Sequence, residues 1–255
     1  MVFVNLIMSC IIYCLYYDDA SFAKAQRYQE IYPEIVKLLK LGNISVYFEG
    51  QVFPLLFERI DEWKNKKYVG IIGGSNFAKK CGALWDFDKV ANSFADSVDV
   101  IGFFPAPWNA SLYFQSCAFH PYFGEIWSYA LGTQLGYTHE QITEPQIPFF
   151  ASNYWMARPS WLLRYIEFYE LVKNILQSSP NNISQMLHSD SNYQGCLPKE
   201  DLIRISGKPY YTHHPFIMER MPCFFFHTKG AKITRLCLPS HVELLASKEL
   251  FERVL

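Results

Sequence analysis

Charged residues are scarce in this chain of 255 residues, at 18% of the total, and no long block of like charge occurs. The run from Lys64 to Lys67 is the longest concentration of one sign. Acidic and basic residues nearly balance, which leaves a formal net charge of −1 at pH 7. Proteins that bind nucleic acid by neutralising phosphates carry a basic surplus. The composition therefore argues against a nucleic-acid partner.

Paired cysteine patterns are also missing. The seven cysteines are scattered at positions 10, 14, 81, 117, 196, 223 and 237, with no CxxC pair. An odd, scattered set makes a disulfide framework or a zinc site improbable. The sequence predicts reduced, mostly buried thiols and a cytoplasmic protein, in the host cytoplasm if the source is viral.

The chain has little sequence that is apolar enough to cross a membrane. Met1–Tyr17 comes nearest, and a signal anchor is the alternative interpretation. This run is shorter than the roughly 20 residues of a membrane span, contains Asn5 and Ser9, and lacks a basic segment before it. We expect a buried parallel strand over Ile11–Tyr16 instead, and no integral membrane segment.

Hydrophobic and aromatic residues are abundant, at 50% and 17%. Apolar segments of strand length alternate with segments of helical periodicity, without repeats or an interdomain linker. We expect strands over 11–16, 43–48, 68–72, 98–104 and 149–156, and helices over 22–38 (broken near Pro33), 54–63, 120–131, 159–172, 214–221 and 242–254. The pattern predicts one α/β domain, 1–255, with a Rossmann-like, mainly parallel sheet between helices. Its ligands would bind at the carboxyl ends of the strands.

Two acidic residues, Asp18 and Asp19, follow the first expected strand. At that position a carboxylate can accept hydrogen bonds from a ribose or a uracil. The alternative is that Asp19 caps a helix that begins near Ser21.

A glycine-rich turn, Gly73-Gly74-Ser75, ends the third expected strand and precedes Lys79. Backbone amides and a nearby lysine can hold a diphosphate, and on this interpretation Ser75 and Lys79 are binding residues. A plain turn is the alternative, because the segment matches neither phosphate-binding glycine fingerprint.

The tripeptide Asp86-Phe87-Asp88 has the D-x-D form. Asp86 and Asp88 on one edge of a turn can hold Mn²⁺ or Mg²⁺, and such an ion neutralises the diphosphate of a sugar nucleotide. Both residues could instead start the helix that follows, where carboxylates are favourable.

Two denser motifs complete the candidates. In Asn153-Tyr154-Trp155-Met156, Asn153 can bond hydroxyls and Trp155 can stack on a sugar, unless the strand is simply buried. In His213-His214-Pro215-Phe216-Ile217-Met218-Glu219-Arg220, Glu219 can act as a base, and Arg220 or His214 can bind phosphate. The alternative for Glu219 and Arg220 is a buried pair that fixes the helix.

These motifs in this order resemble a set of glycosyltransferase-like proteins. The set includes capsular and cell-surface polysaccharide synthesis enzymes and sequences from large algal viruses. The resemblance covers roughly residues 45 to 225, through short and variable motifs. It rests on the segments Tyr47–Glu49, Trp63, Tyr68–Ile72, Asp99–Ile101, His120–Trp127, Asn153–Met156 and Pro215–Arg220.

The resemblance implies a GT-A-like fold that transfers a hexosyl or pentosyl group from a nucleotide-sugar donor to a glycan or glycoprotein acceptor. It implies site roles for Asn153, Trp155, Glu219 and Arg220. Such enzymes often have a D-x-D at a strand end, whereas Asp86-Phe87-Asp88 here follows only the short apolar segment 83–85. A catalytically inactive relative that binds a glycan or nucleotide is the alternative function.

Overall fold

The computed structural model describes residues 9–42, 45–73, 87–94, 97–103, 111–150, 153–195 and 197–236. Its strands are β1 (Cys10–Tyr16), β2 (Val36–Lys40), β3 (Tyr68–Gly73), β4 (Val100–Phe103), β5 (Trp155–Ala157) and β6 (Ile233–Leu236). Its helices are α1 (Asp19–Ile31), η1 (Phe48–Gln51), α2 (Val52–Glu58), α3 (Ile60–Trp63), α5 (Phe87–Ser93), α6 (Leu112–Phe119), α7 (Phe123–Trp127), η2 (Ser128–Gln134), α8 (His139–Ile142), α9 (Pro159–Gln177), α10 (Asn181–Leu187), α11 (Lys199–Ser206) and α12 (His214–Thr228).

The six strands form one sheet in the order β2-β1-β3-β5-β4-β6. Every neighbouring pair is parallel except those of β5, which runs antiparallel to both β3 and β4. Trp155 lies opposite Ile71 on one side and Gly102 on the other. The start of β5 therefore lies at the carboxyl ends of its two neighbours. The mainly parallel α/β sheet predicted from the sequence is confirmed.

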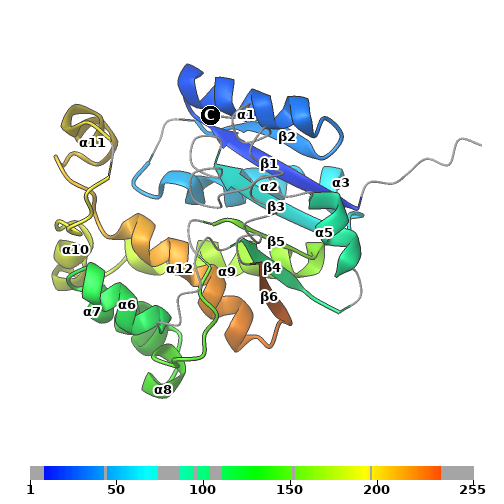
Figure 1. Cartoon of the computed structure of the whole chain (residues 1–255). Helices are drawn as coiled ribbons and strands as arrows, with labels where there is room; N and C mark the ends of the chain where they lie inside the picture. The colour runs from blue at the N-terminus through cyan, green and yellow to red at the C-terminus, as the bar shows by residue number, and fades with distance from the viewer. Residues whose placement is uncertain are drawn as a thin grey trace, which may run out of the picture.

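The sheet is buried on both faces, because side chains alternate between two cores along each strand. In β1, Ile11, Tyr13 and Leu15 belong to a core shared with α2, α7, α9 and α12, whereas Cys10, Ile12 and Cys14 face α1 and α5. Figure 1 shows α1 beside β1 and β2, and α12 and α9 across the other part of the sheet. Burial on both faces explains why β1 reads as a continuous apolar run.

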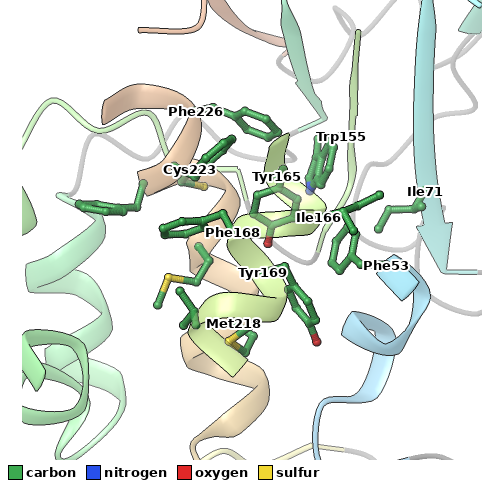
Figure 2. Close-up of a cluster of buried hydrophobic side chains, with 14 of the residues drawn as sticks. Phe53, Ile71, Trp155, Tyr165, Ile166, Phe168, Tyr169, Met218, Cys223 and Phe226 are labelled. Atoms are coloured by element: carbon green, nitrogen blue, oxygen red, sulfur yellow. The ribbon is translucent and has the colours of Figure 1, made fainter. Parts of the chain in front are cut away.

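Trp155 belongs to the larger core, where it lies beside Tyr165 (Figure 2). Its ring stacks on Phe53 of α2 at a centroid distance of 6.1 Å, and meets Tyr165 of α9 and Phe226 of α12 edge-on at 5.4 and 5.2 Å. One side chain thus joins the sheet to three helices.

The second strand was predicted in the wrong place. The predicted helix over 22–38 ends at Ile31, two residues before Pro33, and Val36–Lys40 is a strand paired with β1 from Ile12↔Val36 onward. Proline cannot continue the hydrogen bonding of a helix, and five residues are too few to separate the periodicity of a strand from that of a helix. Residues 45–48, the described part of the predicted strand 43–48, form a turn and the start of η1.

The other predicted elements are confirmed with shifted bounds, apart from the helix over 242–254, which lies outside the described residues. The strand predicted over 149–156 starts only at Trp155, and the helix expected from His120 begins at Phe123 and continues through η2. Helices α6, α8, α10 and α11 and strand β6 were not predicted. None of the helices in the described ranges combines the length and the apolar character that a membrane span requires.

Candidate functional site at the carboxyl edge of the sheet

The order β2-β1-β3 creates a switch point in the sheet. From β1 the chain passes to β2 on one side, and β3 then pairs with β1 on the other. Connections diverge at such a point, and ligands of open α/β sheets bind beyond the carboxyl ends of the two strands. The ends of β1 and β3 therefore define the candidate site.

Asp18 and Asp19 lie at the end of β1, as the sequence predicted, and both are exposed. Asp18, not Asp19, caps α1, which corrects the predicted cap. Its Oδ1 accepts hydrogen bonds from the backbone N–H of Ser21 at 2.7 Å and from the Ser21 hydroxyl at 2.6 Å. The Ser21 hydroxyl holds the pKa of Asp18 below its usual value. Asp19 is the first residue of α1 and takes no part in this cap.

Glu49, on η1, brings a carboxylate to the switch point. A Cβ built on Gly73, the last residue of β3, would lie 2.5 Å from Glu49 Oε1 and 3.2 Å from the Tyr154 hydroxyl. On the β1 side, burial raises the pKa of the Cys14 thiol, and the nearby charge of Glu49 raises it further. Glu49 is partly exposed and therefore lies between β1 and β3 within reach of solvent.

Aromatic contacts hold η1 in this position. Tyr47 meets the His214 ring edge-on at 5.3 Å, and Phe48 stacks on Tyr211 at 5.7 Å. Gly50 lies directly against the Tyr169 hydroxyl, where a larger residue would collide. The segment is fixed between the sheet edge, α9 and the start of α12. Sequence reasoning missed Glu49 as a site residue, because only the tertiary fold brings η1 to the ends of β1 and β3.

Asn153 lies at the same edge, as expected. It comes two residues before β5, whose start lies at the carboxyl ends of β3 and β4. Its backbone is left-handed, with φ of 56°, a conformation that asparagine tolerates better than most residues. The side chain is only 7% exposed, and its Oδ1 has no hydrogen-bond partner among the residues that the structure describes. A buried acceptor without a donor costs free energy, so a ligand or water that donates to it is favoured.

Trp155 does not reach this edge. Its ring is 1% exposed and belongs to the core between β5, α2, α9 and α12. Its position agrees with the alternative interpretation from the sequence, in which the strand is simply buried. No sugar can stack on the ring in this arrangement.

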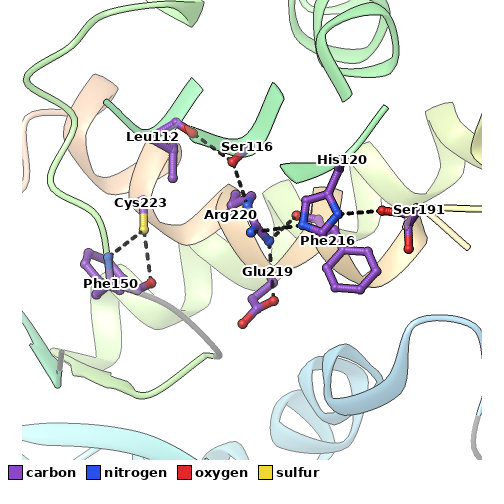
Figure 3. Close-up of polar contacts among 9 residues, drawn as sticks. All are labelled: Leu112, Ser116, His120, Phe150, Ser191, Phe216, Glu219, Arg220 and Cys223. Atoms are coloured by element: carbon purple, nitrogen blue, oxygen red, sulfur yellow. Dashed lines mark hydrogen bonds and ion pairs between the residues drawn. The ribbon is translucent and has the colours of Figure 1, made fainter. Parts of the chain in front are cut away.

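Arg220 lies inside a polar network between α6 and α12 (Figure 3). Its guanidinium donates to the Ser116 hydroxyl at 2.7 Å, to the Phe216 carbonyl at 3.0 Å and to His120 Nε2 at 3.4 Å. Because arginine has no acceptor, His120 Nε2 must accept, so Nδ1 carries the proton and donates to the Ser191 carbonyl at 3.0 Å. Arg220 is 9% exposed, which makes it a buried residue that joins helices.

Glu219 is the more accessible member of the pair. Its carboxylate lies 3.4 Å from the Arg220 guanidinium and retains 21% of its side-chain exposure. In Figure 3 it leaves α12 on the side away from Ser116. Helix α12 packs against η1, so Glu219 lies on the helix that borders the segment carrying Glu49.

His213 and His214 are buried at the start of α12, at 0% and 3% exposure. Burial lowers the pKa of His213 to about 4 and that of His214 to about 3, with neighbouring histidines adding to both shifts. His214 Nδ1 lies 3.0 Å from the Thr212 hydroxyl, and its ring centroid lies 4.7 Å from that of His188. Neutral rings in these positions bind phosphate poorly and pack well.

Asp88 lies far from the carboxyl edge. It is in the first turn of α5, where Oδ1 accepts the Ser9 N–H at 2.8 Å and Oδ2 accepts the Asn92 amide at 3.0 Å. Ser9 immediately precedes β1, so Asp88 is at the amino end of that strand and Asp18 is beyond its carboxyl end. Asp86, Ser75 and Lys79 lie outside the described residues.

The described residues do not fit a D-x-D metal site. Both oxygens of Asp88 are already engaged in hydrogen bonds, at the wrong end of β1. In the parts of the chain that the structure describes, no three histidine, cysteine or acidic side chains converge as metal ligands.

Comparison with known proteins adds no name to this geometry: no family model, no curated protein and no solved structure matches the chain.

Proposed function

We propose that the chain is a GT-A-like glycosyltransferase, which moves a sugar from a nucleotide-sugar donor to a glycan or glycoprotein acceptor. One observation carries the proposal. Glu49 lies beside Gly73, the last residue of β3, and α12, which bears Glu219, packs against the η1 segment that carries Glu49. Asp19, shortly after β1, and Asn153, two residues before β5, belong to the same edge by their places in the chain. Carboxylates and an amide at such an edge suit the hydroxyls of a nucleotide sugar.

Glu219 is the proposed base. Its carboxylate would take the proton of the acceptor hydroxyl as that oxygen bonds to the anomeric carbon of the donor. The nucleoside diphosphate leaves with the electron pair of the broken glycosidic bond. Arg220, at 3.4 Å, orients the carboxylate and is itself held by Ser116 and His120. We assign no step to a metal ion, because Asp88 does not fit a metal site.

The test is release of nucleoside diphosphate from a panel of sugar nucleotides, with glycan acceptors, with and without Mn²⁺. Glu219→Gln should lower kcat about 100-fold or more, because a positioned base contributes on that scale. Exposed Glu167→Gln on α9 is the matched control, and Asp88→Asn should retain the wild-type kcat.

Absence of turnover with every donor would contradict the proposal. If donors bind without turnover, the catalytically inactive binding relative becomes the better description. A wild-type rate in Glu219→Gln would remove that residue as the base while leaving the transferase activity in place.

A further inference from the structure

We propose that Glu49 binds the ribose diol of a ribonucleotide at the β1–β3 switch point, with Asn153 as a second acceptor. The inference deepens the proposed function and rests on it for the class of ligand. The sequence suggested Asp18 or Asp19 for this role. The structure places a further carboxylate, that of Glu49, beside Gly73 at the end of β3.

Asp18 is the weaker candidate, since its Oδ1 already accepts two hydrogen bonds from Ser21 as the cap of α1. Turning that oxygen toward a ligand would uncap the helix. Loss of this cap would destabilise α1, so Asp18 is committed to structure.

Glu49 is placed by contacts that leave its carboxylate at the strand ends. It acts on the pKa of Cys14 on β1 and occupies the space that a side chain on Gly73 of β3 would take. The Tyr154 hydroxyl approaches the same point. A carboxylate at the switch point can accept hydrogen bonds from the adjacent hydroxyls of a ribose.

Asn153 provides an independent observation that indicates a ligand. Its Oδ1 is buried and lacks a donor within the described part of the chain, and the residue lies just before β5, at the edge where β3 ends. A hydroxyl that donates to Oδ1 would satisfy it. An exposed aromatic ring also lies at this edge, because Tyr17 follows β1 directly and is 36% exposed. It is placed to contact a nucleobase.

The test measures the affinity of the whole chain for UDP and GDP and for their 2′-deoxy counterparts, by calorimetry without donor or acceptor sugar. The wild-type protein should prefer the ribonucleotides. Glu49→Gln should weaken their binding about 10- to 100-fold, the scale of a hydrogen bond to a charged group, and should bring both forms to similar affinity. Exposed Glu58→Gln on α2 is the matched control and should keep the wild-type preference.

Gly73→Ala is a second variant that leaves Glu49 in place. Its methyl group would displace the flexible end of Glu49, so the preference for ribose should fall while thermal stability changes little. A wild-type ribose preference in both variants overturns the inference, and so does the absence of any nucleotide binding. Ribose-dependent binding that needs Glu49 supports the inference even if the protein transfers no sugar. Failure of the inference can therefore be distinguished from failure of the proposed function.

Discussion

Burial governs the chemistry of the polar residues around α12. Arg220 stays charged within a set of fixed acceptors, whereas His120, His213 and His214 are neutral because a charged imidazole would lose its hydration there. In the sequence His213 and His214 precede Glu219 and Arg220, and this motif indicates catalysis or phosphate binding. In the structure His213, His214 and Arg220 are buried, which leaves Glu219 as the accessible residue of the motif.

At the residue scale, the buried histidines predict loss of stability in acid. The folded-state pKa values of about 4 and 3 lie below the unfolded value of about 6.5. Stability is therefore complete above pH 6.5 and falls as the pH drops toward 4, because the unfolded chain takes up protons that the folded chain refuses. We expect the free energy of unfolding to fall by about 2–4 kcal/mol between pH 7 and pH 5.

Urea denaturation at several pH values measures this slope. His213→Phe and His214→Phe should each make it shallower, while His139→Asn, at an exposed position on α8, should not. An unchanged slope in both buried variants would show that the acid sensitivity arises elsewhere.

At the scale of elements, strand β4 needs a glycine at position 102 because Phe150 packs directly against it. Phe150 lies over Gly102, where an added Cβ would come within 2.7 Å of Phe150 Cβ and 2.8 Å of its Cγ. Phe150 cannot move away easily, because its N–H donates to Cys223 Sγ at 3.3 Å and its carbonyl accepts from the same thiol at 3.2 Å. These contacts fix three parts of the chain against one another: strand β4, helix α12 and the segment that contains Phe150.

Gly102→Ala should therefore destabilise the protein by about 1–3 kcal/mol, as overpacking does in a core. Gly42→Ala is the control, since an added Cβ there meets nothing within 4 Å. Chemical denaturation of both variants measures the difference. Equal stability of the two would mean that Phe150 relaxes without cost.

At the scale of the whole molecule, the sheet separates two hydrophobic cores. Trp155 belongs to the larger core, with Phe53, Tyr165 and Phe226 around it (Figure 2). Its contacts join the sheet to three helices, so its effect on function should pass through stability.

Trp155→Phe should lower the free energy of unfolding by about 1–3 kcal/mol, from lost contacts and a partly filled cavity. Ribonucleotide affinity of the folded variant should stay at the wild-type value. Trp161→Phe on α9, at a partly exposed site, should cost less. Circular dichroism in denaturant and calorimetry separate the two properties, and a selective loss of affinity at full stability would restore Trp155 as a sugar platform.

Much of the fold could be predicted from local pattern. The run Ile11–Tyr16 indicated a buried strand, observed as Cys10–Tyr16, and the periodicity after Pro159 indicated α9, because both reflect burial that repeats along a single element. The second strand could not be placed in this way, because Val36–Lys40 is too short to separate the two periods. The antiparallel direction of β5 was also not predictable, since the pairing partner lies far away in the chain.

The sequence by itself determined the α/β class and the burial of the sheet on both faces, because alternating elements of fixed period permit few other packings. That ligands bind at the carboxyl edge stays a prediction from this class of fold. Only the tertiary structure decided which polar residues reach that edge. It brought Glu49 to Gly73 and left Asn153 Oδ1 without a donor among the described residues, while it placed Trp155 and Arg220 in the interior and Asp88 at the opposite end of β1. Residue type sets what a side chain can bind, but the register and packing of distant segments set what it can reach.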